Sequence, residues 1–149
     1  MKTKLKLVAE KDIPILFEHL KEFVSTPNAS TTGNKLPKFI DSKKFVLKYL
    51  NDNQNHEYDK WYLVLNDKNI IIGNVILSKK NMISYHILKK YQRNKHGEEA
   101  IQILMEKNPR QKYFATVNKK NIKSKKFIKK FHFEEKGIIF ELNKNSKKL

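Results

Sequence analysis

Apolar and polar residues recur along the chain at two spacings, one typical of helices and one of strands. In residues 12–24 and 97–107 apolar side chains return every three or four positions, which places them on one face of a helix. In residues 4–8 and 82–88 they follow the alternation of a half-buried strand. The same reasoning predicts further helices over residues 41–50 and 118–131. It predicts further strands over residues 61–65, 70–77, 112–117, 133–135 and 138–142.

The predicted order is β-α-α-β-β-β-α-β-α-β-β, with no internal repeat. No linker is long enough to divide it, so residues 1–142 are expected to form a single domain, followed by a lysine-rich C-terminal tail of residues 143–149. Residues 66–69 (NDKN) are the expected turn of a hairpin between the second and third strands. Gly73, inside the third strand, predicts a bulge or a close approach of two backbones.

The stretch 83–107 joins a predicted strand to a predicted helix through a polar, basic turn. The first turn of a helix leaves backbone N–H groups unpaired and carries the positive end of the helix dipole. Such a turn attracts anions. Gly97, at the start of the helix, has no side chain and would let a ligand approach the backbone.

Composition excludes several classes of protein. The 149 residues contain no cysteine, which rules out disulfides, thiolate metal sites and cysteine nucleophiles. No apolar run is long enough for a signal peptide or a membrane span, so a soluble, cytoplasmic protein is expected. His19, His56 and His132 do not combine with plausible carboxylate ligands, and no metal site is expected.

The formal net charge of +17 is carried mainly by lysine. One interpretation is a polyanionic partner, such as nucleic acid, an acidic protein or a phosphate-rich cofactor. The other is a compositional bias of the kind found in AT-rich genomes, because asparagine and isoleucine are also abundant. Arginine is scarce although its planar guanidinium recognises nucleic acid better than lysine does, which favours the second interpretation.

The run from Tyr91 to Ala100, YQRNKHGEEA, resembles motif A of the GCN5-related N-acetyltransferases (GNAT), which reads Q/R-x-x-G-x-G/A. Gln92 and Gly97 match the two ends of the motif, whereas Lys95 stands where the family usually has its first glycine. In the family this turn receives the pyrophosphate of acetyl-coenzyme A. The resemblance therefore implies a cofactor-binding turn that consists of Gln92, Arg93, Asn94, Lys95, His96 and Gly97.

The helix predicted over residues 118–131 resembles motif B of the same family, N-x-x-A/S-x-x-x-Y-x-K-x-G-F. Ile128 takes the place of the tyrosine that protonates the leaving thiolate in many members, and His132 replaces the glycine, which implies an altered turn. In the family the asparagine of this motif contacts coenzyme A, while an ordinary helix cap is the alternative for Asn121. The positions that match the motif are Asn121, Ser124, Lys130 and Phe133.

The order of elements agrees with the family from the first strand to the last. The resemblance implies an α+β fold with a central, mostly antiparallel seven-stranded sheet, flanked by four helices and splayed between strands 4 and 5. It implies an acetyl-coenzyme A-dependent N-acetyltransferase in which a primary amine attacks the thioester directly. A backbone N–H near His86 or Ile87 would bind the cofactor by holding the acetyl carbonyl.

His86 is the candidate general base, because an unperturbed imidazole titrates near neutrality. A purely structural histidine is the alternative. His86 is predicted to share a face of its strand with Met82, where the family often has a glutamate. Glu57 and Tyr58 are further candidates, and Ser124 is the second catalytic candidate.

The acceptor is not specified by the sequence. A small amine, an amino sugar, a protein N-terminus and aminoacyl-tRNA all remain open, and the positive charge favours the last slightly. The alternative function is a non-catalytic module of the same fold that binds nucleic acid or another polyanion through its basic face. No membrane association is expected, and the protein is expected to be a monomer or a homodimer. The side chains expected near the phosphates of coenzyme A are Arg93, Lys95, Lys119, Lys120, Lys123 and Lys126.

Overall fold

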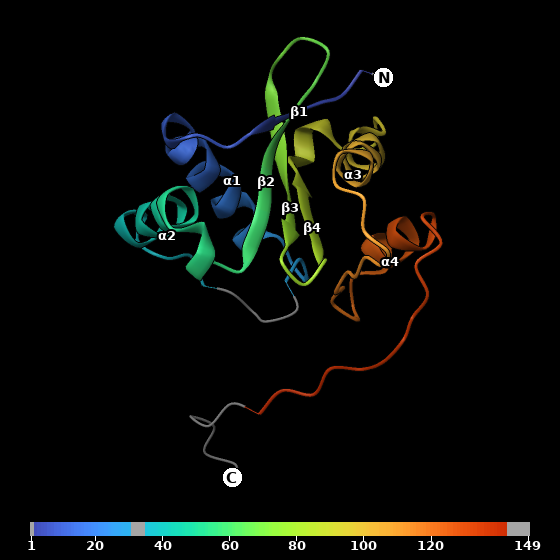
Figure 1. The fold of residues 1–149 in the computed structure, drawn as a ribbon. Coiled ribbons are helices and arrows are strands. Elements are labelled where there is room, and N and C mark those ends of the chain that lie inside the picture. The colour runs from blue at the N-terminus through green and yellow to red at the C-terminus, as the bar shows by residue number, and fades with distance from the viewer. Residues whose placement is uncertain (1, 31–34, 143–149) are drawn as a thin grey trace.

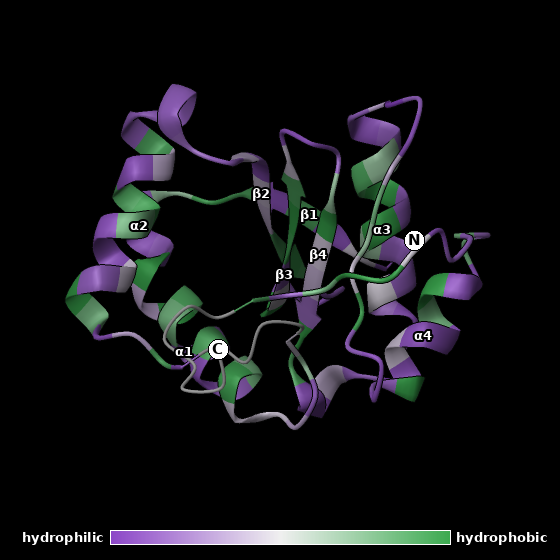
Figure 2. Ribbon diagram, turned by 90° about the horizontal axis from the view of Figure 1, so that it is seen from below, coloured by the Kyte–Doolittle hydropathy of each residue, from purple (hydrophilic) through white to green (hydrophobic). Residues whose placement is uncertain are grey.

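The computed structural model describes residues 2–30 and 35–142, and it places them in three layers (Figure 1). The strands are β1 (Lys4–Leu7), β2 (Tyr58–Leu65), β3 (Ile71–Ser78) and β4 (Ile83–Ile87). The helices are α1 (Ile13–Ser25), α2 (Phe39–Asn51), α3 (His96–Lys107) and α4 (Ile122–Lys129). The sheet is antiparallel in the order β1-β2-β3-β4. Helices α1 and α2 cover one face of it and α3 and α4 the other, as Figure 2 shows from a second direction.

The helices form where the spacing of apolar residues predicts them. In α1 the buried positions are Ile13, Leu16 and His19, three residues apart. Pro14 lies in the first turn, where its missing N–H costs no hydrogen bond. Helix α2 begins at Phe39, two residues before the predicted start. None of the helices in the described residues combines the length and the apolar character needed to cross a membrane.

Two apolar cores hold the three layers together. The core between the sheet and α1 and α2 consists of Val8, Ile13, Leu16, Val46, Tyr49, Trp61, Leu63 and Ile76. The core on the other face, against α3, consists of Tyr62, Val64, Ile72, Val75, Leu77, Ile83, Ile87, Ala100, Ile101 and Leu104, with Phe127 and Phe131 of the α4 region packed on it. Because side chains alternate along a strand, the two central strands, β2 and β3, contribute to both cores.

Gly73 lies where β3 passes close to β4, as the sequence predicts. A Cβ atom at this position would collide with the backbone oxygen of His86. The register between β2 and β3 also shifts beside it, between Val64 and Leu65. A register shift and a close backbone approach are therefore both present.

Gly73→Ala is expected to lower the free energy of unfolding by about 1–3 kcal/mol, because the added methyl group forces two paired backbones apart. Unfolding in urea would measure the change. Gly137→Ala is the matched control, since a Cβ there has no neighbour within 4 Å. Equal stability of Gly73→Ala and the wild type would contradict the close packing of β3 on β4.

The prediction of a seven-stranded sheet is wrong, because the sheet has four strands in the described part of the chain. Residues 112–117 contact β4 through an isolated parallel bridge between Met82 and Phe114. Residues 133–135 and 138–142 form no strand, and Phe140 is 90% exposed on a segment that extends away from the three layers (Figure 1). Alternation shows only that a segment suits a strand, and a strand forms only beside a backbone with which it can pair. Since residues 112–117 leave β4 after Phe114, the last two segments have no continuous edge to join.

The last helix is shorter than the predicted 118–131. Asn118 closes a turn instead, because its side-chain oxygen accepts the N–H of Lys120 (2.9 Å). Asn121 then caps α4 by accepting the N–H of Ser124 (3.0 Å). His132, after the helix, has a φ of +65°. The expected altered turn is therefore a left-handed one, the conformation that glycine adopts most readily. The predicted tail, residues 143–149, lies outside the described residues.

Candidate functional site

Strand β4 and residues 112–117 meet at one end and part at the other. The N–H of Ile83 donates to the oxygen of Phe114 (2.7 Å), and the N–H of Phe114 donates to the oxygen of Asn81 (2.9 Å). Beyond this bridge no further backbone hydrogen bond joins the two segments within the described residues. The second half of β4 therefore has a hydrogen-bonding edge without a backbone partner in the described part of the chain.

The free edge of β4 presents the N–H groups of alternate residues. Leu88 donates its N–H to β3 (2.8 Å), whereas Ile83 donates away from β3. Peptide groups alternate in direction along a strand, so the N–H groups of Tyr85 and Ile87 also point away from β3. The N–H of His86 points toward β3. Of the residues expected to hold the acetyl carbonyl, Ile87 therefore offers its N–H, together with Tyr85, and His86 does not.

The turn before α3 has the backbone of a glycine-rich loop, but its residues carry side chains. Arg93 and Lys95 have φ values of +68° and +64°, in the left-handed region. Lys95, which takes the place of the first glycine of motif A, is the N-cap of α3. The substitution by lysine therefore preserves the backbone conformation that a glycine would provide there.

Gln92 connects this turn to β4 and to α4. Its Nε2 donates to the backbone oxygen of Ile87 (2.9 Å), and its Oε1 accepts from Nζ of Lys123 (2.7 Å). Asn94 donates a long hydrogen bond of 3.4 Å to the backbone oxygen of Gln92. These contacts bring a lysine of α4 to the start of α3, where the cationic side chains of Arg93 and Lys95 are exposed.

Two residues of motif A face the interior. His96 is buried, with Nδ1 2.9 Å from Oγ1 of Thr3, which in turn donates to Glu99 (2.8 Å). A Cβ at Gly97 would lie 3.3 Å from the ring of Phe127. The absent side chain of Gly97 thus makes room for α4, which differs from the expectation that it admits a ligand. For His96 and Gly97, the backbone N–H groups are the parts that could meet an anion.

Asn121 is a helix cap, the alternative that the sequence left open. Its Nδ2 also donates to the backbone oxygen of Asn28 (3.2 Å). Asn118 makes a similar bond to the oxygen of Ser30 (2.8 Å). The two asparagines therefore hold residues 28–30, which follow α1, against the start of α4.

His86 faces α1, on the side of the sheet opposite α3 and α4. Its Nε2 lies 2.8 Å from Oε2 of Glu22, and the two side chains are 14% and 32% exposed. The two side chains are in close polar contact and form an ion pair only when the imidazole is protonated. Glu22 also accepts the N–H of Lys89 (3.1 Å), and the ring of Phe23 packs edge-on against His86. These contacts fix the carboxylate beside the imidazole.

His19 completes this cluster. It is 2% exposed, and neither ring nitrogen has a hydrogen-bond partner among the described residues. Burial, and to a smaller extent the charge of His86, lowers the pKa of His19 to about 4, against the opposing effect of Glu22. In the described part of the chain no group of His, Asp or Glu residues is arranged to hold a metal ion.

Burial also lowers the pKa of His86, and the nearby charge of Glu22 raises it by less. The imidazole is therefore neutral at neutral pH and ready to accept a proton, as a general base must be. Sequence reasoning missed Glu22. The available signal was its spacing, since His19 and Glu22 are two polar residues three apart on the otherwise apolar face of α1.

Tyr85 precedes His86 in the chain and projects to the opposite face of the sheet. Its hydroxyl lies 3.3 Å from Oγ of Ser124, and its ring packs on Phe127 with the ring centres 4.9 Å apart. Burial raises the pKa of the Tyr85 phenol, and the hydrogen bond to Ser124 lowers it by less. Ile128 is only 8% exposed and packs in the core. The sequence singled out Ser124 in this region, and the structure adds Tyr85 beside it.

The other acidic and phenolic candidates make contacts elsewhere. Tyr58 packs against Tyr49 and Trp61 between the sheet and α2, and burial raises its pKa to about 12. Its neighbour Glu57 is exposed. Neither residue lies with His86 and Glu22 in the cluster that α1 and β4 form.

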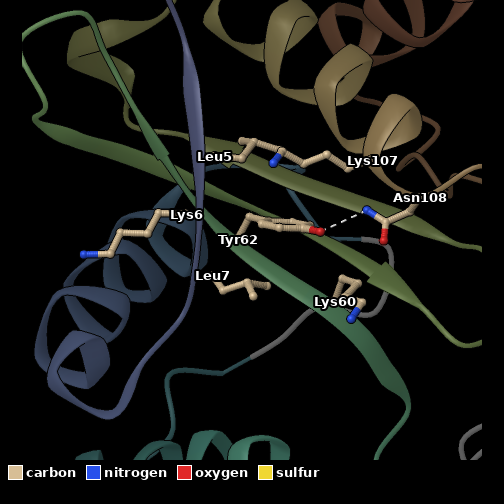
Figure 3. A pocket seen from close by; sticks show the side chains of 7 residues that line it. All are labelled: Leu5, Lys6, Leu7, Lys60, Tyr62, Lys107 and Asn108. Atoms are coloured by element: carbon tan, nitrogen blue, oxygen red, sulfur yellow. Dashed lines mark hydrogen bonds between the residues drawn. The ribbon is translucent and has the colours of Figure 1, made fainter.

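A separate groove lies at the opposite edge of the sheet (Figure 3). It has a volume of about 670 Å³ and lies between β1, β2 and the end of α3. The hydroxyl of Tyr62 accepts a hydrogen bond there from Asn108 (3.0 Å). The groove contains none of the candidate site residues, and its lining consists of Leu5, Lys6, Leu7, Lys60, Tyr62, Lys107 and Asn108.

Solved structures that superpose on this chain are acetyltransferases. A possible acetyltransferase from Clostridium difficile 630 has a TM-score of 0.69 at 13% identity, and the match covers 96% of this chain and 98% of the other. A GNAT superfamily phosphinothricin acetyltransferase from Sinorhizobium meliloti, in complex with acetyl-coenzyme A, has a TM-score of 0.72 at 16% identity, with 92% and 77% covered. The chain has the GNAT fold.

The GNAT fold is also that of RimL, the ribosomal L7/L12 α-N-protein acetyltransferase, in complex with coenzyme A. This structure has a TM-score of 0.72 at 18% identity, and the match covers 92% of this chain and 82% of RimL. No family model and no curated protein matches the chain. The likeness to GNAT proteins is therefore one of three-dimensional structure.

Proposed function

We propose that this protein is an acetyl-coenzyme A-dependent N-acetyltransferase that transfers the acetyl group to a primary amine. The observation that carries the proposal is the free edge of β4, where the N–H groups of Tyr85 and Ile87 have no backbone partner among the described residues and lie next to the turn at Gln92. The pantetheine arm of coenzyme A contains amide groups, and these can pair with such an edge as an added strand would. The acetyl carbonyl would accept one of the two N–H groups.

The turn from Gln92 to Gly97 is the proposed site of the pyrophosphate. The first amides of α3 carry the positive end of the helix dipole, and the left-handed residues Arg93 and Lys95 shape the turn in front of them. Lys123 reaches the same turn through Gln92. In this proposal His96 contributes its backbone and Asn94 its exposed amide side chain.

His86 is the proposed general base. It accepts a proton from the attacking amine on the α1 side of the sheet, and the carboxylate of Glu22 stabilises the imidazolium that forms. An N–H of the β4 edge stabilises the negative charge that develops on the carbonyl oxygen, an effect typically worth about 10²–10³-fold in rate. The acceptor stays open among a small amine, an amino sugar, a protein N-terminus and aminoacyl-tRNA.

Thermal unfolding with acetyl-coenzyme A, compared with a single-stranded oligonucleotide, tests the proposal. Ligand at about 100 times its Kd is expected to stabilise the protein by about 2.7 kcal/mol. We expect acetyl-coenzyme A to raise Tm at low and at high salt, and the oligonucleotide to act, if at all, only at low salt. Stabilisation by the oligonucleotide alone would support the non-catalytic, polyanion-binding alternative. An acceptor screen at fixed acetyl-coenzyme A, read as release of free thiol, then identifies the amine.

A further inference from the structure

We propose that Tyr85 is the residue that protonates the thiolate of coenzyme A as it leaves, a role for which the side chain at Ile128 offers no group. This inference rests on the proposed function and assigns its second proton transfer. It concerns a residue of β4, whereas motif B places the corresponding hydroxyl on α4, at the position of Ile128.

The position of Tyr85 on β4 supports this role. Its N–H lies on the free edge, so a thioester held there lies against the backbone of Tyr85 itself. Its side chain projects to the face of α3 and α4, while the next side chain, His86, projects to the face of α1. A base and a hydroxyl group from consecutive residues thus flank the same edge from opposite sides.

The contacts of the phenol hold it at α4 without consuming its proton. Phe127 packs on the ring, and Ser124 lies within hydrogen-bond distance of the hydroxyl (3.3 Å). A hydroxyl is both a donor and an acceptor, so Ser124 can donate to Tyr85 while the phenol donates to sulfur. The Ser124 hydroxyl is a far weaker acid than a phenol, which makes it a positioning residue. Lys123 is bound to Gln92 at the phosphate end instead.

Atoms and electrons balance in the resulting transfer. His86 removes a proton from the nitrogen of the attacking amine, and a tetrahedral adduct forms at the acetyl carbon. The carbon–sulfur bond then breaks, its electron pair goes to sulfur and the carbonyl forms again. The O–H bond of Tyr85 breaks and its proton goes to sulfur, which yields coenzyme A as the free thiol. Water returns a proton to the phenolate, and the imidazolium of His86 gives its proton to solvent.

Binding of coenzyme A, compared with desulfo-coenzyme A, tests the contact without requiring an acceptor. At about pH 9 part of the thiol of coenzyme A is ionised, and a phenol that donates to the sulfur should favour coenzyme A over the analogue without sulfur by about 10-fold. Tyr85→Phe should remove this preference: coenzyme A binds about 10-fold more weakly and desulfo-coenzyme A binds unchanged. Calorimetric titration gives the dissociation constants of both compounds for the wild type and for Tyr85→Phe. The ratios of these four constants give the contribution of the contact between the phenol and sulfur.

Two variants complete the test. Tyr62→Phe removes a buried hydroxyl on β2, which β3 separates from β4, and should leave the dissociation constants of both compounds at their wild-type values. Ser124→Ala keeps the phenol and should reduce the preference for coenzyme A only in part. With an acceptor from the screen, Tyr85→Phe should lower kcat by about 10²-fold or more with little change in KM for acetyl-coenzyme A.

Two results would overturn the assignment of Tyr85. A preference for coenzyme A that survives in Tyr85→Phe would show that the phenol does not touch sulfur. Equal weakening of coenzyme A and desulfo-coenzyme A would show a purely structural role. Failure of the wild type to bind either compound is a different result, because it refutes the proposed function and with it this inference.

Discussion

His86→Ala is expected to lower kcat by about 10²–10⁴-fold, the usual contribution of a positioned general base. The imidazole lies beside Glu22, 2.8 Å away, and is held by α1 on the face of β4 that the amine would approach. The measurement is thiol release at saturating acetyl-coenzyme A, with an amine taken from the acceptor screen. A kcat within twofold of the wild type would remove His86 from the mechanism.

The role of His86 as general base also predicts how kcat/KM should change with pH. A general base works when neutral, so activity falls as pH drops through the pKa of the base. Because burial lowers the pKa of His86 from 6.5, the fall in the wild type should lie below pH 6.5. Glu22→Gln removes a charge that raises this pKa, so the fall should move to still lower pH. Glu18→Gln is the matched control, since Glu18 is an exposed carboxylate on the same helix, and it should leave the profile unchanged.

His19→Leu is expected to make stability less dependent on pH. In the native protein the pKa of His19 is about 4, against 6.5 for an unperturbed histidine. Between these two pH values the imidazole of His19 is therefore protonated in the unfolded chain and neutral in the folded one. The native state of the wild type should therefore lose about 3 kcal/mol of stability from this group as pH falls from above 6.5 to below 4. The leucine variant should lack that loss. At neutral pH it should be at least as stable, because it no longer buries two ring nitrogens that have no hydrogen-bond partner among the residues the structure describes.

Urea unfolding at several pH values between 4 and 7 measures the difference. His132→Asn serves as the control, since His132 is exposed and asparagine tolerates its left-handed backbone. The control should follow the wild type at every pH. Parallel curves for His19→Leu and the wild type would show that His19 is hydrated or paired in solution.

Local periodicity was sufficient to predict the helices and the β2–β3 hairpin, because their apolar faces repeat within a few residues. It was sufficient for Gly73 as well, since a glycine inside an apolar strand commonly marks a bulge or a close backbone approach. It was not sufficient for the last three predicted strands. Residues 138–142 are apolar enough for a strand, but whether they pair depends on the path of residues 112–117, which no local pattern encodes.

In the candidate site, too, some residues could be predicted from the local sequence and others could not. His86 and the turn from Gln92 to Gly97 could be found in the sequence, because a titratable residue and a motif mark them. Glu22 lies 64 residues before His86 and meets it only when α1 packs on the sheet. The contact between Tyr85 and Ser124 likewise joins two segments distant in the chain. Such pairs follow from tertiary packing, which periodicity does not reveal.

Lys95 and His132 show that the backbone conformation of a motif can persist after its glycines have been replaced. Both stand where the family pattern has glycine, and both have a positive φ, at +64° and +65°. A left-handed residue with a side chain costs about 1–2 kcal/mol, so the surrounding structure must impose the conformation. Glycine at either position would relieve that cost. Pattern scans that demand glycine will pass over divergent acetyltransferase-like chains of this kind, whereas a search for the dihedral signature of the turn would recover them.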